Sequence, residues 1–387
     1  MPATERPGRL LVAGVTTRPL AASAARAGWS VVAVDAFGDL DLRECARVRV
    51  LRREDGGFHP TAAAANARDI TADAVAYTSN FENYPVAVAS LAEGRRLLGN
   101  PSGVLERVRD PLGLMLALSR NGFATPLTRA RSPHTATPGP RRWLLKPRRS
   151  GGGHGTSAWR PGHPVGRHQY LQERVAGMPG SITFLADGSR ALAVGVSRQI
   201  VGDRAFGASG FRYCGSLVAG RGLFPAERML LARACAMAQT VTREFGLVGL
   251  NGIDFIARAG VPWPIEVNPR WSASMELLER RKETPLFLLH AEACAGRLPE
   301  TGRSPLRGVT GKAVVFARRD VVLGDTRAWL RDPRVADIPR PGERILRGRP
   351  ICTVFASGSN AAGCRRALAS RAAAIYRALE PAARGAA

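Results

Sequence analysis

The chain has 387 residues, of which 45% are apolar and 22% are charged. This length allows about two to four packed units and excludes a peptide or a single small binding module. Basic residues outnumber acidic ones by 56 to 31, which gives a formal charge of +25. Only three of the basic residues are lysines, however, and the arginines are spread along the whole chain. We therefore expect salt-dependent affinity for polyanions but no specific nucleic-acid partner.

The cysteines and the apolar stretches give no sign of a metal–thiolate site, a leader or a membrane span. The six cysteines include no C-x-x-C pair, so reduced thiols are expected. The apolar run 10–15 is too short for a signal peptide. Residues 229–250 are interrupted by Arg233, Arg243 and Glu244, which argues against a membrane helix. We expect a cytoplasmic protein without membrane contact.

The first segment alternates strands and helices. Residues 10–15 are expected to form a buried strand, 19–27 a helix with Pro19 in its first turn, and 30–34 a strand that ends at Asp35. A further strand is expected at 74–78, followed by a helix to about residue 98. Such units form a parallel sheet with a ligand crevice at the carboxyl ends of its strands. The first turn lacks the three glycines of a dinucleotide site.

The rest of the chain mixes longer strands with a few helices. Helices are expected at 111–120, at 226–245, where apolar residues recur at helical spacing, and at 361–379. Strands are expected at 143–147, 170–176, 181–186, 191–199, 252–257, 263–267, 312–317 and 351–356.

The first chemical signal is a lysine on a strand followed by a glycine-rich loop. Lys146 lies in the strand 143–147, and glycines follow at Gly151, Gly152, Gly153 and Gly155. Backbone N–H groups of such a loop can surround phosphate oxygens, and the lysine adds a fixed positive charge. The alternative is a flexible surface loop. The sequence is not a P-loop, because no Gly-Lys-Ser/Thr follows.

The second signal is a set of oxygen ligands on a predicted hairpin. Asp254 precedes Glu266 by twelve residues, and Asn268 and Arg270 follow at steps of two. Pairing of the two strands would place these side chains on one face. Oxygen ligands of this kind suit Mg²⁺ held between carboxylates and nucleotide phosphates, and an arginine can steady a transferring phosphoryl group. The alternative is a solvated hairpin with an incidental ion pair.

The order of lysine strand, glycine loop, Gln172-Glu173, long helix and acidic hairpin resembles the ATP-grasp superfamily from about residue 100 to 270. The resemblance implies a mixed α/β and α+β protein, an ATP-grasp fold with a preceding Rossmann-like α/β domain. The implied parts are the preceding domain 1–99, the ATP-grasp domain 100–300 and a strand-and-helix segment 301–387. Within the ATP-grasp domain, 100–170 would be the central subdomain and 171–300 the nucleotide-binding lobe.

The resemblance also implies ATP and Mg²⁺ as cofactors and assigns roles by position. The phosphates would bind Lys146 and the loop glycines Gly151, Gly152, Gly153 and Gly155, and adenine would bind Glu173 with the backbone at Arg174 and Val175. The magnesium ligands would be Asp254, Glu266 and Asn268, and the catalytic cations Arg270 and Lys146.

Two positions depart from the family pattern. Many relatives carry a lysine eleven residues before the glycine that ends the first helix, and here that position is Pro111, with Arg107 and Arg109 as alternatives. The ribose-binding glutamate expected seven residues after Glu173 is replaced by Gly180.

The tail 336–356, together with residues 81–83, resembles a poorly characterised ATP-grasp group related to biotin carboxylase and to carboxylate–amine ligases. Its association with one-carbon metabolism in methylotrophs implies a role in cofactor biosynthesis. We expect an ATP-dependent ligase that activates a small-molecule carboxylate as an acyl phosphate for attack by an amine substrate. The alternatives are carboxylation through carboxyphosphate and a nucleotide-binding regulatory or nucleic-acid-associated protein without turnover. A homodimer is left open.

For each of four further residues, two interpretations of its role are open. Arg18 and Asp35 lie at strand ends, where they would either contact the acceptor substrate or form turns. His154 in the glycine loop would either contact phosphate or face solvent. Lys312 would either reach the site from the tail or lie on the surface.

Overall fold

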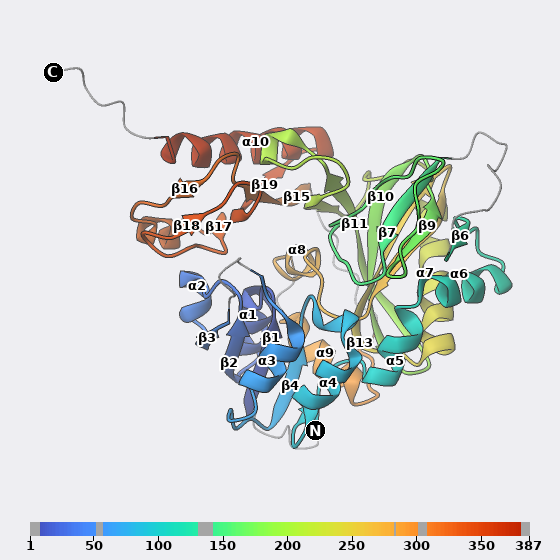
Figure 1. Cartoon of the computed structure of the whole chain (residues 1–387), viewed down its shortest axis with the longest axis horizontal. Helices are drawn as coiled ribbons and strands as arrows, with labels where there is room; N and C mark the ends of the chain where they lie inside the picture. The colour runs from blue at the N-terminus through green and yellow to red at the C-terminus, as the bar shows by residue number, and fades with distance from the viewer. Residues whose placement is uncertain (1–7, 52–56, 131–141, 282–283, 301–307, 381–387) are drawn as a thin grey trace.

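The computed structural model describes residues 8–51, 57–130, 142–281, 284–300 and 308–380 (Figure 1). Residues 1–7, 52–56, 131–141, 282–283, 301–307 and 381–387 lie outside this description.

The N-terminal unit is a parallel sheet with the strand order β3-β2-β1-β4-β5, which confirms the expected parallel arrangement. Its strands are β1 (Arg9–Gly14), β2 (Ser30–Asp35), β3 (Arg47–Val50), β4 (Ala74–Tyr77) and β5 (Arg96–Leu97). Its helices are α1 (Arg18–Arg26), α2 (Leu40–Arg43), α3 (Pro60–Asn66) and α4 (Pro85–Ala92), with a 3-10 turn, η1 (Phe81–Asn83). Helices cover both faces of β1, and its residues from Leu10 to Ala13 are therefore fully buried.

Two short helices, α5 (Ser102–Val108) and α6 (Pro111–Arg120), lead into a small antiparallel sheet. Its order is β6-β9-β7-β8, with β6 (Thr128–Arg129), β7 (Trp143–Pro147), β8 (Ser157–Ala158) and β9 (Gln169–Glu173). The Asp110 carboxylate accepts from the Gly113 N–H at 2.9 Å, which caps the start of α6.

An eight-stranded antiparallel sheet forms the largest layer, in the order β14-β13-β10-β11-β12-β15-β19-β17. Its strands are β10 (Met178–Asp187), β11 (Ala191–Val201), β12 (Tyr213–Ala219), β13 (Val248–Arg258), β14 (Val261–Asn268), β15 (Val309–Phe316), β17 (Val335–Ala336) and β19 (Pro350–Gly358). Strands from the tail thus extend the sheet that holds the predicted acidic hairpin. The division of the chain near residue 300 stays a proposal.

Helices α7 (Glu227–Phe245) and α10 (Ala361–Ala378) cover the large sheet. The predicted apolar stripe of α7, which includes Leu230, Met237 and Val241, lies in the main core. The remaining elements are α8 (Met275–Glu279), α9 (Leu286–Cys294), the strand pair β16 (Val321–Val322) and β18 (Arg344–Ile345), and the 3-10 turns η2 (Arg204–Phe206) and η3 (Arg327–Arg331). Of the helices described, none is long and apolar enough to cross a membrane.

The N-terminal unit and the tail face each other across α8 (Figure 1). The Leu40 N–H of α2 donates to the Ile338 carbonyl of the tail at 2.7 Å. This contact brings residues from the N-terminal unit and from the tail, such as Asp39 and Asp337, to the wall of one cavity.

Several expected elements differ in detail. The helix expected to reach residue 98 ends at Ala92, because residues 96–97 pair with β4 as the edge strand β5. The strand expected at 170–176 ends at Glu173. Strand β12 and helices α8 and α9 were not expected. Strand β12 pairs with the preceding strand β11 and with β15, which is distant in sequence, and the pairing with β15 leaves no local sequence signal.

Candidate active site

A cavity of about 1340 Å³ lies where the three sheets meet. Its walls include the lysine strand β7, the glycine loop, the β13–β14 hairpin and the carboxyl ends of the N-terminal strands. Every residue that the sequence assigned to the site lines this cavity (Lys146, Gly151, Gly152, Gly153, Gly155, Glu173, Arg174, Val175, Asp254, Glu266, Asn268 and Arg270). The structure thus brings the two sequence signals together.

The hairpin places two carboxylates directly opposite each other. Asp254 of β13 pairs with Glu266 of β14, and Gly252 pairs with Asn268. Like charges at directly opposite positions repel. Burial and the charge of Glu266 together raise the pKa of Asp254 to about 6. The hydrogen bonds from Ser181 and Gln199 and the charge of Arg270 lower the pKa of Asp254 but offset burial and the charge of Glu266 only in part.

The surroundings of this pair fit a divalent cation with oxygen ligands. Ser181 of β10 pairs with Asp254 from the other side, and its hydroxyl acts against the effect of burial by favouring the ionised carboxylate of Asp254. Among the residues that the structure describes, no three His, Cys, Asp or Glu side chains gather as a metal site. A cation at the hairpin would therefore need the Asn268 amide and oxygens of a bound ligand to complete its shell.

Arg270 lies at the end of the hairpin and is held by buried partners. Its Nη2 donates to Glu82 Oε1 at 2.7 Å and to Asn268 Oδ1 at 3.1 Å. The Arg270 side chain is 9% exposed and that of Glu82 is 1% exposed. The buried Nε of Arg270 has no partner. The guanidinium is thus fixed in orientation but keeps one buried donor unused.

Lys146 faces the cavity from β7. Its Nζ donates to Gln172 Oε1 at 3.0 Å and lies 5.6 Å from the centre of the Tyr170 ring. Both partners lie on β9, which pairs with β7. The neutral partners orient the ammonium without neutralising it.

The glycine loop contacts residues 211–213, although Gly152, His154 and Gly155 are exposed. The Tyr213 N–H donates to the Gly152 carbonyl at 2.9 Å. A Cβ on Gly153 would lie 1.9 Å from the Phe211 carbonyl oxygen, and one on Gly155 would lie 2.7 Å from Pro147 Cγ. Both glycines also have positive φ angles, of 77° and 71°. Side chains at these two positions would therefore disrupt the loop.

The structure separates the two arginines that were alternatives for the missing lysine. Arg109 lines the cavity. It donates to Asn83 Oδ1 at 2.8 Å, to the Ser150 carbonyl at 3.0 Å and to Glu266 Oε2 at 3.4 Å. Arg107 instead donates to the carbonyls of Gly103 and Phe245. Only Arg109 is placed to contact a ligand in the cavity.

The proposed adenine hinge is partly occupied by contacts within the chain. Glu173 Oε2 accepts from the Leu127 N–H at 3.2 Å, and the Arg174 N–H donates to the Arg142 carbonyl at 2.8 Å. The assignment of Glu173, Arg174 and Val175 to adenine stays a prediction.

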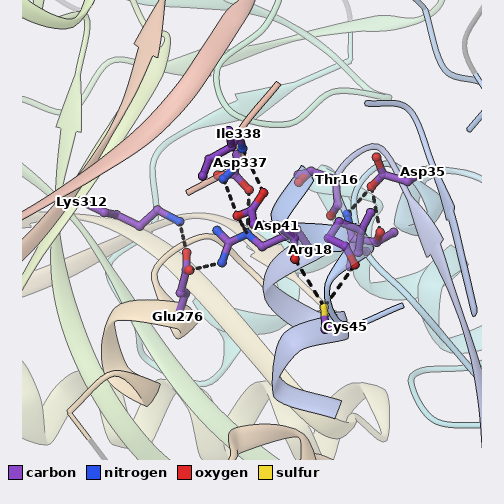
Figure 2. A network of polar contacts seen from close by, with 12 residues as sticks. Thr16, Arg18, Asp35, Asp41, Cys45, Glu276, Lys312, Asp337 and Ile338 are labelled. Carbon is purple, nitrogen blue, oxygen red and sulfur yellow. Dashed lines mark hydrogen bonds and ion pairs between the residues drawn. The ribbon is translucent and has the colours of Figure 1, made fainter. Parts of the chain in front are cut away.

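A network of charged residues joins the N-terminal unit, α8 and the tail (Figure 2). Lys312 is 3% exposed, and its Nζ donates to Glu276 Oε2 at 2.6 Å, so its surface reading is wrong. Arg18 also contacts Glu276, and its Nε donates to Asp337 Oδ1 at 2.9 Å. Burial alone would raise the pKa of Glu276, but the charges of Arg18 and Lys312 outweigh it and lower this pKa. Glu276 was not among the residues that the sequence analysis singled out, and Asp337 and Glu82 entered it only within the segments 336–356 and 81–83, without an assigned role.

Asp35 has a different environment. It accepts from the N–H and hydroxyl groups of Thr17 at 2.7 and 2.8 Å, and from the N–H groups of Phe37 and Gly38. These contacts support its reading as a turn residue. His154 lines the cavity, and Ser150 Oγ donates to its carbonyl at 2.5 Å.

Two antiparallel sheets lie around one cavity, and a parallel α/β unit precedes them. Residues 108–274 match the family model described as an ATP-grasp domain. The chain therefore contains an ATP-grasp domain over these residues.

Proteins similar to this chain include one archaeal relative and two solved structures. An uncharacterised protein of Methanocaldococcus jannaschii is 29% identical over 118 residues, which cover 30% of this chain and only 28% of that relative. The L-amino acid ligase of Bacillus licheniformis has a TM-score of 0.70 at 15% identity, over 97% of this chain and 99% of its own. The biotin carboxylase domain of the 2-oxoglutarate carboxylase of Hydrogenobacter thermophilus has a TM-score of 0.68 at 14% identity, over 96% and 90%. These structural similarities show the fold alone.

Proposed function

We propose that the protein is an ADP-forming ATP-dependent ligase that activates a small-molecule carboxylate as an acyl phosphate, which an amine then attacks. The observation that carries this proposal is the position of the acidic hairpin, with Asp254 opposite Glu266, in the same cavity as Lys146 and the glycine loop. Separated positive and negative walls of this kind suit a nucleotide triphosphate with its divalent cation.

In this proposal, bound Mg²⁺-ATP supplies the phosphoryl group, and the chain binds, orients and neutralises charge. Lys146 and the loop N–H groups would hold phosphate oxygens, with Arg109 as a further phosphate contact. Asp254, Glu266 and Asn268 would hold the cation. Arg270, which Glu82 and Asn268 fix in orientation, would stabilise the phosphoryl group in transfer.

Carboxylation is the second candidate. It is supported by the biotin carboxylase domain of similar fold, whose structure is a dimer in complex with MgADP and bicarbonate. In that reaction bicarbonate, and not an organic carboxylate, would receive the phosphoryl group. A homodimer and a role in one-carbon cofactor biosynthesis are further proposals, and the latter rests on the resemblance of the tail alone.

The products distinguish these candidates. A ligase should release ADP and phosphate, and ¹⁸O from the labelled acceptor carboxylate should appear in the phosphate. Hydroxylamine should trap the acyl phosphate as a hydroxamate without bicarbonate. Turnover that requires bicarbonate, with its carbon in the product, would replace the ligase by the carboxylase. AMP and pyrophosphate would reject both.

Variants test the assignment of the hairpin. Glu266→Ala and Asn268→Ala should each abolish ADP formation and leave the thermal unfolding transition cooperative. Glu106→Gln on the exposed side of α5 is the control and should keep full activity. Unchanged turnover in Glu266→Ala would refute the proposed cation site.

A further inference from the structure

Asp39, between β2 and α2, is a buried carboxylate without a partner. It is 5% exposed and lines the main cavity. It stands at the N-cap position of α2, where its backbone carbonyl accepts from the Arg43 N–H, but its side chain makes no capping bond. Among the residues described, none forms a hydrogen bond or an ion pair with its carboxylate. Burial of an unpaired carboxylate is costly, and such groups rarely persist without a role.

The neighbouring charges do not compensate it. Asp337, Asp35 and Asp41 lie close enough to repel Asp39, and Arg18 is the attracting neighbour. Arg18, however, already contacts Glu276, Asp337 and Asp41. Burial, followed by the charges of these three aspartates, raises the pKa of Asp39 well above its usual range.

The other carboxylates nearby have donors of their own. Asp41 accepts from the N–H groups of Asp337 and Ile338, both at 2.9 Å. Asp35 accepts from three N–H groups and one hydroxyl. Asp39 is thus the member of this cluster whose carboxylate has no partner among the described residues, and it lines the cavity. In a protein of formal charge +25, the local excess of acid at the cavity wall stands out against the overall charge.

We propose that Asp39 binds an ammonium group of the second substrate, so that the acceptor enters this cavity as an organic cation. The proposal rests on the proposed ligase function and names the acceptor's chemical class and the residue that selects it. A cation at Asp39 would restore the charge balance that the fold leaves open, because an opposite charge favours the ionised carboxylate. The same wall would repel an anion such as bicarbonate.

The stability of Asp39→Asn gives the first test. The amide has the shape of the carboxylate but no charge, so this variant should unfold at a higher temperature than the unmodified protein at pH 8 in the absence of ligands. Glu44→Gln, an exposed acid on the solvent side of the same segment, should leave the midpoint unchanged. A lower midpoint for Asp39→Asn would show that the carboxylate is structural and would overturn the proposal.

Binding gives the second test. In calorimetric titrations at pH 7, n-butylammonium should bind the full-length protein saturably, and the neutral isostere n-butanol should not. Asp39→Asn should weaken the ammonium at least tenfold, while Glu44→Gln should not. Equal binding of amine and alcohol, or an unchanged amine affinity in Asp39→Asn, would overturn the assignment.

A parallel titration with Mg²⁺ and a non-hydrolysable ATP analogue keeps the two proposals apart. Asp39→Asn should bind this nucleotide as the unmodified protein does. Nucleotide binding without amine selectivity would refute the role of Asp39 and leave the ligase proposal standing. Amine selectivity without nucleotide binding would refute the ligase proposal and leave the ammonium site in place.

Discussion

Replacing Asp254 by asparagine should stabilise the ligand-free protein above pH 6 and remove its response to Mg²⁺ with nucleotide. The pKa of Asp254 is raised from 3.8 to about 6 by burial and by Glu266. The folded state therefore holds this proton more tightly than the unfolded state does. The associated stability is fully present below pH 3.8 and is lost as the pH rises through about 6.

The size of the effect follows from the shift in pKa. A shift of about two units corresponds to about 3 kcal/mol, and water in the cavity reduces it to roughly 1–2 kcal/mol. For a chain of this length, this corresponds to roughly 2–4 °C in the unfolding midpoint. The unfolding midpoint of Asp254→Asn should therefore lie above that of the unmodified protein by this amount at pH 8. The difference between the two midpoints should vanish near pH 4.

Differential scanning calorimetry between pH 4 and pH 8 measures this difference, and Asp187→Asn gives a control of opposite sign. The N–H groups of Ser189 and Arg190, at 3.0 and 2.7 Å, outweigh burial and lower the pKa of Asp187 to about 2. That variant should lose stability at neutral pH. Adding Mg²⁺ with nucleotide at pH 8 should raise the midpoint of the unmodified protein more than that of Asp254→Asn. A pH-independent difference would refute the electrostatic account of the hairpin.

Three further outcomes are expected. Arg109→Ala should weaken nucleotide binding at least tenfold in a fluorescence titration, because Arg109 joins the glycine loop to Glu266, whereas Arg107→Ala should not; equal effects would count against the phosphate role of Arg109. Glu173→Ala should raise the KM for ATP more than it lowers kcat, the pattern of uniform binding, and a fall in kcat alone would contradict the hinge assignment. In filter binding at two salt concentrations, DNA and RNA should bind without sequence preference and dissociate at moderate salt; sequence-selective binding that survives would return nucleic acid to the list of partners.

The parts of the site that are local in sequence could be predicted. The twelve-residue separation of Asp254 and Glu266 indicated a hairpin, and the two residues pair directly. Lys146 and the glycines share one short segment, so a strand followed by a loop was enough to place them. Two-residue periodicity along a strand and the spacing of a hairpin are rules of local geometry, which explains why these positions were found.

The contacts that join distant segments could not be predicted. Glu82 contacts Arg270 across 188 residues of sequence, and Arg18 contacts Glu276 across 258. Asp39 gave no signal, because its lack of a partner becomes visible only when the N-terminal unit and the tail enclose it. These contacts depend on how the three sheets pack, and no spacing along the chain encodes that packing.

The most direct test of the ATP-dependent activity is a calorimetric titration of the full-length protein with Mg²⁺ and a non-hydrolysable ATP analogue. The account predicts saturable binding at one site that requires Mg²⁺ and is lost in Glu266→Ala. Absence of binding to the unmodified protein at millimolar nucleotide would contradict it.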